Sequence, residues 1–257
     1  MRNLLLGLRQ ARYESKVFWR NPPAAFFTFF LPLMFLVIFN LLLGNREITV
    51  PGGSTHTSTF YVPSIIALSV ISACYTNIAM NMTFSRDRGL LKRVRGTPLP
   101  GWAFLFGSIS NAVLVAVILV VIIISAGTIF YNVDVPTNTM VAMLVTLVLG
   151  AATFCSLGIA VTSLIPNSAA APAIVNASIL PLLFISDIFI PMGNVPDWLI
   201  TFTNIFPVKH FSSALQATFN PFESGNGFEP VDLMVMFGWM LFGVITSIRF
   251  FSWEPRE

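Results

Sequence analysis

Residues 85–100 read SRDRGLLKRVRGTPLP and lie between two uncharged runs, 60–84 and 102–130, each long enough to cross a bilayer. The stretch holds five of the chain's 14 lysines and arginines. Its last five residues, GTPLP, include one glycine and two prolines, which are residues that end helices. The stretch therefore predicts a short basic helix between two membrane spans, suited to contact a partner on the cytoplasmic face.

The composition is that of a membrane protein. Of its 257 residues, 55% are hydrophobic and only 10% are charged, and the mean hydropathy is +0.80. An ordinary soluble domain carries about 25% charged residues. The formal charge of +3 comes from basic residues at the ends of apolar runs, where they orient spans rather than bind nucleic acid. The sequence predicts an all-α polytopic membrane protein with no nucleic-acid partner.

Six apolar runs predict six spans within one transmembrane domain, residues 1–257. A run of twenty helical residues is ~30 Å long, enough to cross the hydrocarbon layer. No charge occurs between Val135 and Ser186, so this stretch is interpreted as two spans joined at Ile165–Ser168. The expected spans are 24–43, 60–84, 102–130, 139–165, 169–186 and 233–251.

Two further segments are expected to lie at the membrane surfaces. Residues 1–21 place apolar and basic side chains on different arcs of a helix, which predicts an amphipathic interface helix. Residues 187–230 are apolar but repeatedly interrupted by proline, which favours short re-entrant helices in the outer leaflet. Asp187, at the outer end of the fifth run, is expected to act as a cap at headgroup level.

The distribution of positive charge predicts the orientation. With both termini inside, 12 of the 14 lysines and arginines fall in cytoplasmic segments, and only Arg46 and Lys209 lie outside. Such a bias is the usual determinant of topology. The expected arrangement has six spans, with the N and C termini in the cytoplasm.

Sequence motifs for chemistry within the chain are missing. It contains no Gly-x-x-x-x-Gly-Lys-[Ser/Thr] loop for ATP and no hydrolase or zinc-protease motif. His56 and His210 lie in separate outer segments, so no metal site is expected. The expected spans carry no acidic residue away from their ends, which disfavours a secondary transporter. We expect neither an enzyme nor a resident cofactor.

Two motifs resemble the permease subunit of type-2 ATP-binding-cassette exporters, close to the daunorubicin-resistance family. Residues 86–100 resemble that family's R-E-x-G-x-L-x-x-L-x-x-T-P-L segment, with Asp87 in place of Glu and Val94 in place of Leu. Residues 188–199 and 206–210 resemble its F-P-x-x-x-L-P-x-W-L…N-P-x-x-x run, with Val195 in place of Leu and Phe206 in place of Asn. The likeness extends over essentially the full length.

This resemblance implies an assembly of two permease subunits and two separate ATPase subunits, with ATP and Mg on the ATPases. The second permease is an identical copy or a paralogue. Residues 1–20 would be a connecting helix, and 188–220 would cap a substrate path between the copies, lined by spans two and five. The coupling helix, 86–95, would contact the ATPase through Arg86, Asp87, Arg88, Leu91, Lys92, Arg93 and Arg95.

The cargo is inferred from the aromatic residues. With 25 Phe but only 4 Tyr and 5 Trp, the path is expected to be apolar, which favours a drug-like amphiphile or a lipid exported across the plasma (bacterial inner) membrane. Export of a polysaccharide or glycolipid, and a non-transporting anchor or sensor coupled to an ATPase, remain alternatives. The candidate lining residues are Tyr75, Asn77, Asn176, Ile179 and Phe184.

Overall fold

The structure is a computed structural model that describes residues 2–43, 47–50, 53–97, 99–131, 133, 135–186, 188–189, 196–220, 222 and 226–254. Helices dominate these residues. In chain order the elements are α1 (Arg2–Trp19), α2 (Pro22–Leu43), β1 (Glu47–Val50), β2 (Gly53–His56), α3 (Thr57–Ile71), η1 (Ser72–Thr76), α4 (Asn77–Asp87), α5 (Leu90–Arg95), α6 (Gly101–Tyr131), α7 (Met140–Val161), α8 (Ala171–Phe184), α9 (Asp197–Thr203), α10 (Pro207–Phe219) and α11 (Pro230–Phe250).

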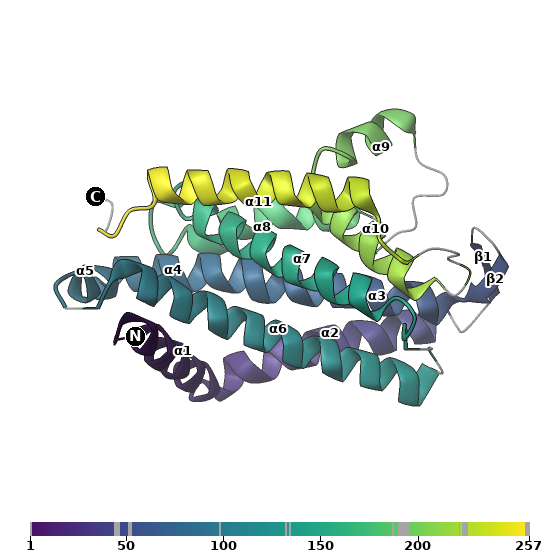
Figure 1. The fold of residues 1–257 in the computed structure, drawn as a ribbon, viewed down its shortest axis with the longest axis horizontal. Helices are drawn as coiled ribbons and strands as arrows, with labels where there is room; N and C mark the ends of the chain where they lie inside the picture. The colour runs from purple at the N-terminus through teal and green to yellow at the C-terminus, as the bar shows by residue number, and fades with distance from the viewer. Residues whose placement is uncertain are drawn as a thin grey trace.

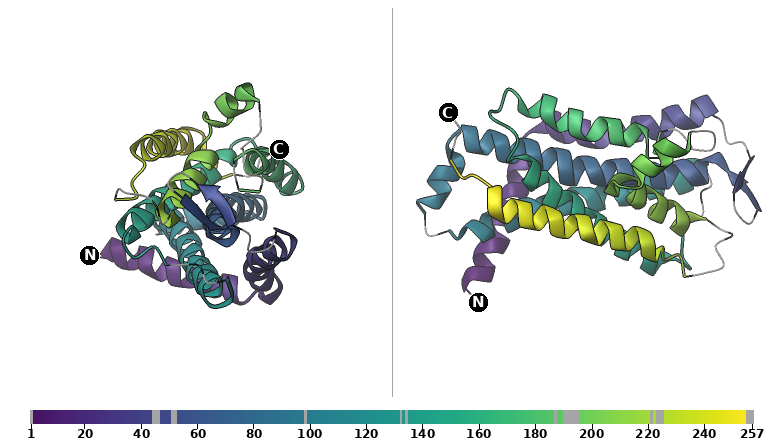
Figure 2. Two further views of the ribbon diagram at one scale, coloured as in Figure 1. Left: turned by 90° about the vertical axis from the view of Figure 1, so that its right-hand side faces the viewer. Right: turned by 90° about the horizontal axis from the view of Figure 1, so that it is seen from above.

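The long helices run side by side along one axis (Figure 1). α5 and both ends of the chain lie at one end of the bundle, called here the α5 end. The β1–β2 hairpin lies at the other, called the hairpin end. α1 runs across the long axis rather than along it, as the two views of Figure 2 show, and it packs on α6. That α1 is an interface helix stays a prediction.

Five helical stretches among the described residues are long and apolar enough to cross a membrane. They are Pro22–Leu42, Thr57–Asp87, Gly101–Tyr131, Met140–Val161 and Pro230–Phe250. At the fifth expected span, 169–186, α8 has 14 residues and a length of ~21 Å. It is shorter than expected because turns occupy the chain between Val161 and Ala171. The all-helical polytopic fold is confirmed, whereas the count of six spans stays a prediction.

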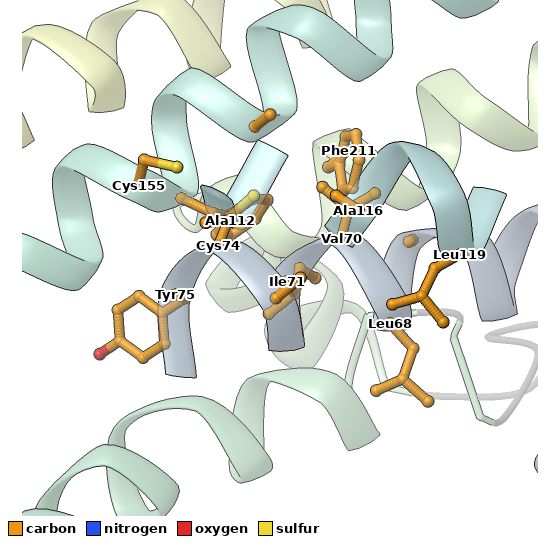
Figure 3. Packing of buried hydrophobic residues seen from close by; sticks show 14 of the residues in the cluster. Leu68, Val70, Ile71, Cys74, Tyr75, Ala112, Ala116, Leu119, Cys155 and Phe211 are labelled. Atoms are coloured by element: carbon orange, nitrogen blue, oxygen red, sulfur yellow. The ribbon is translucent and has the colours of Figure 1, made fainter. Parts of the chain in front are cut away.

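The second span, Thr57–Asp87, forms the centre of the bundle, and most of its residues are buried. It contains a π-helical turn, η1, between α3 and α4. Figure 3 shows Ile71 and Cys74 of this span among side chains from neighbouring helices, including Ala112 of α6 and Cys155 of α7. The second span therefore packs against several helices, and a displacement of it would shift each of them.

A glycine permits the close approach of α7 to this turn. A Cβ atom on Gly158 would lie 2.8 Å from the carbonyl oxygen of Tyr75 and 3.0 Å from that of Cys74. Such separations are below van der Waals contact, and the obstructing atoms belong to backbone that cannot rotate away. The small-residue surface of α7 thus brings its backbone directly against η1.

Of the segments expected outside the spans, one contains regular structure that the sequence did not suggest, and another contains short helices of the expected kind. β1 and β2 form an antiparallel hairpin with Glu47 opposite His56 and Val50 opposite Gly53, although the sequence predicted an all-α protein. In the expected re-entrant segment 187–230, α9 and α10 are short helices. The predictions for Asp187 and Arg46 lie outside the described residues.

Candidate functional site

The segment 85–100, which contains the expected coupling helix 86–95, is divided at a sharp corner. α4 continues to Asp87, and α5 begins only at Leu90. Gly89 makes the corner with φ = 68°, in the left-handed region that a residue without Cβ adopts at little cost. The second span is thus longer at this end than the expected 60–84, and the coupling helix is correspondingly shorter.

Arg86 points into the protein, not toward a partner. Its side chain is only 2% exposed. The guanidinium donates hydrogen bonds to the carbonyl oxygens of Thr162 (3.0 Å), Ile165 (2.6 Å) and Pro166 (3.4 Å). These carbonyls follow the end of α7, where backbone acceptors lack helical partners and the helix dipole is negative. Arg86 therefore joins the second span to the turn between α7 and α8.

Asp87 completes the same joint. Its carboxylate accepts a hydrogen bond from the backbone N–H of Ser168, and its Oδ1 lies 3.7 Å from Nε of Arg86. The ion pairs to a partner expected of Arg86 and Asp87 are thus replaced by internal contacts. Sequence reasoning did not predict these internal contacts of Arg86 and Asp87. The available hint was that the 165–168 turn has no basic residue of its own to bind its backbone carbonyls.

Of the other five expected coupling residues, one is buried against the bundle and four are exposed basic residues. Leu91 is completely buried and fixes α5 to the bundle, assisted by Val94, which packs on the core. On the outer side, Arg95 lies 3.7 Å from Glu254 in a solvent-exposed pair, which contributes little to stability. Of the expected coupling residues, those that present exposed positive charge are Arg88, Lys92, Arg93 and Arg95.

A small polar recess of about 30 Å³ lies where α1, α4 and α6 meet. Glu14 of α1 and Asn77 of α4 line it. Burial raises the pKa of Glu14 above 4.5, while a hydrogen bond donated by Gln10 at 2.8 Å acts in the opposite direction. Asn77, expected on the substrate path, instead lines this recess and accepts a hydrogen bond from Asn81.

A much larger cavity, about 500 Å³, lies between η1, α7, α8, α10 and α11. Its lining is almost entirely apolar, with a few hydroxyl groups. Two of these belong to Tyr75 and Ser178, whose oxygens are 2.6 Å apart and link the second span to α8. A cavity of this size and character can hold a drug-sized hydrophobic molecule oriented by a few polar groups.

Only some of the five candidate path residues reach this cavity. Tyr75 and Ile179 line it. Asn176 and Phe184 lie on the exposed surface of α8, where Phe184 contacts Phe189 at a ring separation of 5.0 Å. The structure thus brings two of the five together, one from the second span and one from α8, at the same cavity.

Sequence reasoning missed the wall supplied by α11. Trp239 and Phe242 of this helix line the cavity, and Nε1 of Trp239 donates a hydrogen bond to the carbonyl oxygen of Ile205 at 2.7 Å. Tryptophan usually lies at membrane interfaces rather than halfway along a span. The position of Trp239 near the middle of a predicted span was the feature of the sequence that could have indicated a lining role for α11.

In the part of the chain that the structure describes, no group of three His, Cys, Asp or Glu side chains is placed to hold a metal ion. Cys74 and Cys155 are buried free thiols.

The chain is similar in sequence to known transport permeases. The chain is 25% identical over 153 residues to a probable multidrug ABC transporter permease, YbhR, of Escherichia coli (strain K12), and this match covers 60% of the chain. It is 26% identical over 195 residues to the putative transport permease ycf38 of Porphyra purpurea, 75% of the chain and 66% of that protein. It is 26% identical over 190 residues to the daunorubicin resistance ABC transporter permease DrrB1 of Streptomyces coeruleorubidus, 72% and 64% respectively.

The aligned part of the chain spans only 41% of the length of the Escherichia coli relative. The sequence profile that describes ABC-2 type transporters matches residues 10–220, which include the second half of α1, the α4–α5 corner and the first four helices that line the cavity. The chain therefore belongs to the ABC-2 type transporter family.

Proposed function

We propose that this chain is the permease subunit of an ATP-driven ABC exporter that moves a hydrophobic or amphipathic molecule, drug-like or lipid, out across the plasma (bacterial inner) membrane. Two copies of a separate ATPase, which binds ATP and Mg, supply the energy. A second permease, identical or paralogous, completes the path. The α5 end and both termini face the cytoplasm, as the distribution of basic residues favours.

The observation that carries this proposal is the joint formed by Arg86 and Asp87. α5 presents exposed positive charge, and Leu91 anchors it in the bundle. One helical turn before α5, the joint fixes the second span to the turn that links α7 and α8. A force applied to α5 by an ATPase would therefore reach three elements that line the large cavity.

The lining of that cavity supports an apolar cargo over a sugar. Aromatic and aliphatic side chains form most of its surface, and Tyr75 and Ser178 already bond to each other. A polysaccharide path would need many more hydrogen-bonding groups, because leaving sugar hydroxyls unpaired in an apolar site is costly. Export of polysaccharide or glycolipid is for this reason the weaker alternative.

The first experiment is affinity purification of the chain in mild detergent, with identification of any ABC ATPase that copurifies and a count of permease chains per complex. The complex is then reconstituted in vesicles, and ATP-dependent movement of a fluorescent hydrophobic amine is measured. A double charge reversal, Arg88→Glu with Lys92→Glu, should uncouple ATP hydrolysis from transport while leaving expression intact.

The matched control exchanges the same two residues without altering charge, as Arg88→Lys with Lys92→Arg, and should transport like the wild type. Wild-type transport by the charge-reversed variant would contradict the coupling role of α5. An ATPase that copurifies but drives no solute movement would favour the non-transporting anchor or sensor. Gradient-driven transport without ATP would favour a secondary transporter.

A further inference from the structure

The large cavity is bounded toward the hairpin end by the turn between α9 and α10, residues 204–206, called here the roof. Phe206 lines the cavity directly. The roof is fixed to α11 by Trp239, whose Nε1 donates to the carbonyl oxygen of Ile205 at 2.7 Å, and whose ring stacks on Phe206 at 6.2 Å. A molecule that left the cavity past Phe206 would meet the roof.

A buried histidine makes the second attachment of the roof to α11. Nε2 of His210 lies 2.8 Å from the carbonyl oxygen of Asn204, and Nδ1 lies 2.6 Å from Oδ1 of Asp232. His210 is 7% exposed, and Asp232 lies in the first turn of α11. The imidazole ring thus connects the end of α9 to the start of α11 through two short contacts.

These two contacts determine how many protons the ring holds. A carbonyl oxygen and an ionised carboxylate are both acceptors, and a neutral imidazole has a single N–H to donate. Both contacts can be hydrogen bonds only when the ring is an imidazolium. In agreement, the hydrogen bond to Asp232 raises the pKa of His210 above 6.5, against the opposing effect of burial.

Few other charges face this ring. Lys209, its neighbour on α10, lowers its proton affinity but is itself bonded to Oδ1 of Asn204 at 2.7 Å. Glu229 precedes α11, three positions before Asp232. α3, α7 and α8, which also pack on α10, contain no charged residue. Asp232 is therefore the principal charged partner of His210.

We propose that His210 is a positioning residue that closes the exit of the cavity, by joining the roof to α11 while protonated and releasing it on losing that proton. One of its two bonds is lost with the proton, because the neutral ring cannot donate to both acceptors. The inference rests on the proposed export function, because that function makes the hairpin end the outer end and the roof the exit side of the cavity. The proton itself is exchanged with the outer solution.

The protonation state can be measured without transport. The purified transporter complex is labelled with ¹⁵N-histidine, and the chain contributes only two histidines, His56 and His210. The variant His56→Gln assigns the two signals. We expect both ring nitrogens of His210 to be protonated at pH 7, and Asp232→Asn to remove one proton. A singly protonated His210 in the wild type at pH 7 would overturn the proposal.

Movement of the roof is measured with a cysteine reporter. Leu182 lines both the cavity and a recess beneath the roof, so Leu182→Cys is made with Cys74→Ala and Cys155→Ala. A membrane-impermeant maleimide is added from the outer side. The readout is a ratio of two labelling rates at the same pH, that of the otherwise wild-type reporter divided by that of the reporter with His210→Gln. The effect of pH on thiol reactivity is the same in both rates and cancels in the ratio.

This ratio should be about one tenth or less at pH 6, because loss of one charged hydrogen bond changes an opening equilibrium by roughly tenfold or more. It should approach one at pH 9. Asp232→Asn should resemble His210→Gln, whereas Glu229→Gln, which removes a nearby carboxylate, should behave as wild type. A ratio that stays near one at pH 6 would overturn the gating role even if ATP-driven export is established.

Discussion

The guanidinium of Arg86 donates a 2.6 Å hydrogen bond to the carbonyl oxygen of Ile165, 79 positions later in the chain. This contact connects the base of the second span to the turn after α7. It places the most basic segment of the chain and an uncharged turn at the same end of the bundle (Figure 1). The first prediction tests its contribution to stability.

Replacing Arg86 by methionine or glutamine should lower the free energy of unfolding by about 2–4 kcal/mol, because buried carbonyls lose charged donors. Arg86→Lys should rescue only part of this loss, since an ammonium cannot reproduce the planar fork. Thermal unfolding in detergent provides the measurement. The control is Arg88→Gln, an exposed arginine two positions away, which should leave the unfolding temperature unchanged. Equal effects of both substitutions would contradict the assignment of Arg86 as a structural joint.

Leu91→Ala should loosen α5. The side chain is fully buried, and truncating a buried leucine typically costs about 2–5 kcal/mol. Because Leu91 anchors the helix that carries the exposed charges, we also expect ATP hydrolysis to drive less transport per turnover. Leu90→Ala is the matched control, since Leu90 is 43% exposed. Similar coupling ratios in the two variants would argue against Leu91 as the anchor.

Gly158→Ala should destabilise the protein by about 1–3 kcal/mol, because the added methyl group meets the backbone carbonyls of Tyr75 and Cys74. Gly238→Ala in α11 is the control, since a Cβ there has no neighbouring atom within 4 Å. That substitution should be neutral or stabilising, given the higher helix propensity of alanine. The comparison is made by thermal unfolding. If Gly158→Ala unfolded at the wild-type temperature, the close approach of α7 to η1 would be wrong.

Glu14 should make stability depend on pH. Because burial raises its pKa in the folded state, the folded protein holds this proton more tightly than the unfolded chain does. The resulting stabilisation is present below pH 4.5 and is lost as pH rises through the higher folded pKa. Glu14→Gln should therefore raise the unfolding temperature relative to wild type more at pH 8 than at pH 5.

The control for this pH dependence is Glu254→Gln, which alters an exposed carboxylate at the same end of the bundle. Its difference from wild type should be small at both pH values. A Glu14→Gln variant whose difference from wild type did not vary with pH would show that the recess between α1, α4 and α6 does not bury the carboxylate.

The sequence predicted the helical fold well because lipid imposes length and apolarity on each span. α2 and α6 lie close to their expected bounds, since uncharged runs with clear limits define them. α8 differs because turns occupy the residues between α7 and α8, and no count of uncharged residues shows where a helix begins. The β1–β2 hairpin, which lies in a polar segment, was not anticipated.

The candidate site was only partly predictable, for a different reason. Composition identified Arg86 and Arg88 equally as members of a basic segment, but helical phase turns one inward and the other outward. Arg86 has an inward direction because α4 continues to Asp87, whereas the sequence predicted that the second span ends three residues earlier, at residue 84. His210 and Asp232 are 22 positions apart, and only the packing of α10 on α11 brings them together.

The π-helical turn at Ser72–Thr76 sets the angular phase of everything that follows it in the second span. Such a turn accommodates one more residue than an α-helix would, and each residue rotates the chain by about 100°. Deleting a single residue from it would restore regular winding and leave α4 facing nearly the same way, because the wide turn absorbs its extra residue. Deleting a residue between this turn and Arg86 would instead rotate Arg86 by about 100°, away from the carbonyls it now binds. The second span should therefore tolerate a deletion better within Ser72–Thr76 than within the ten residues that follow.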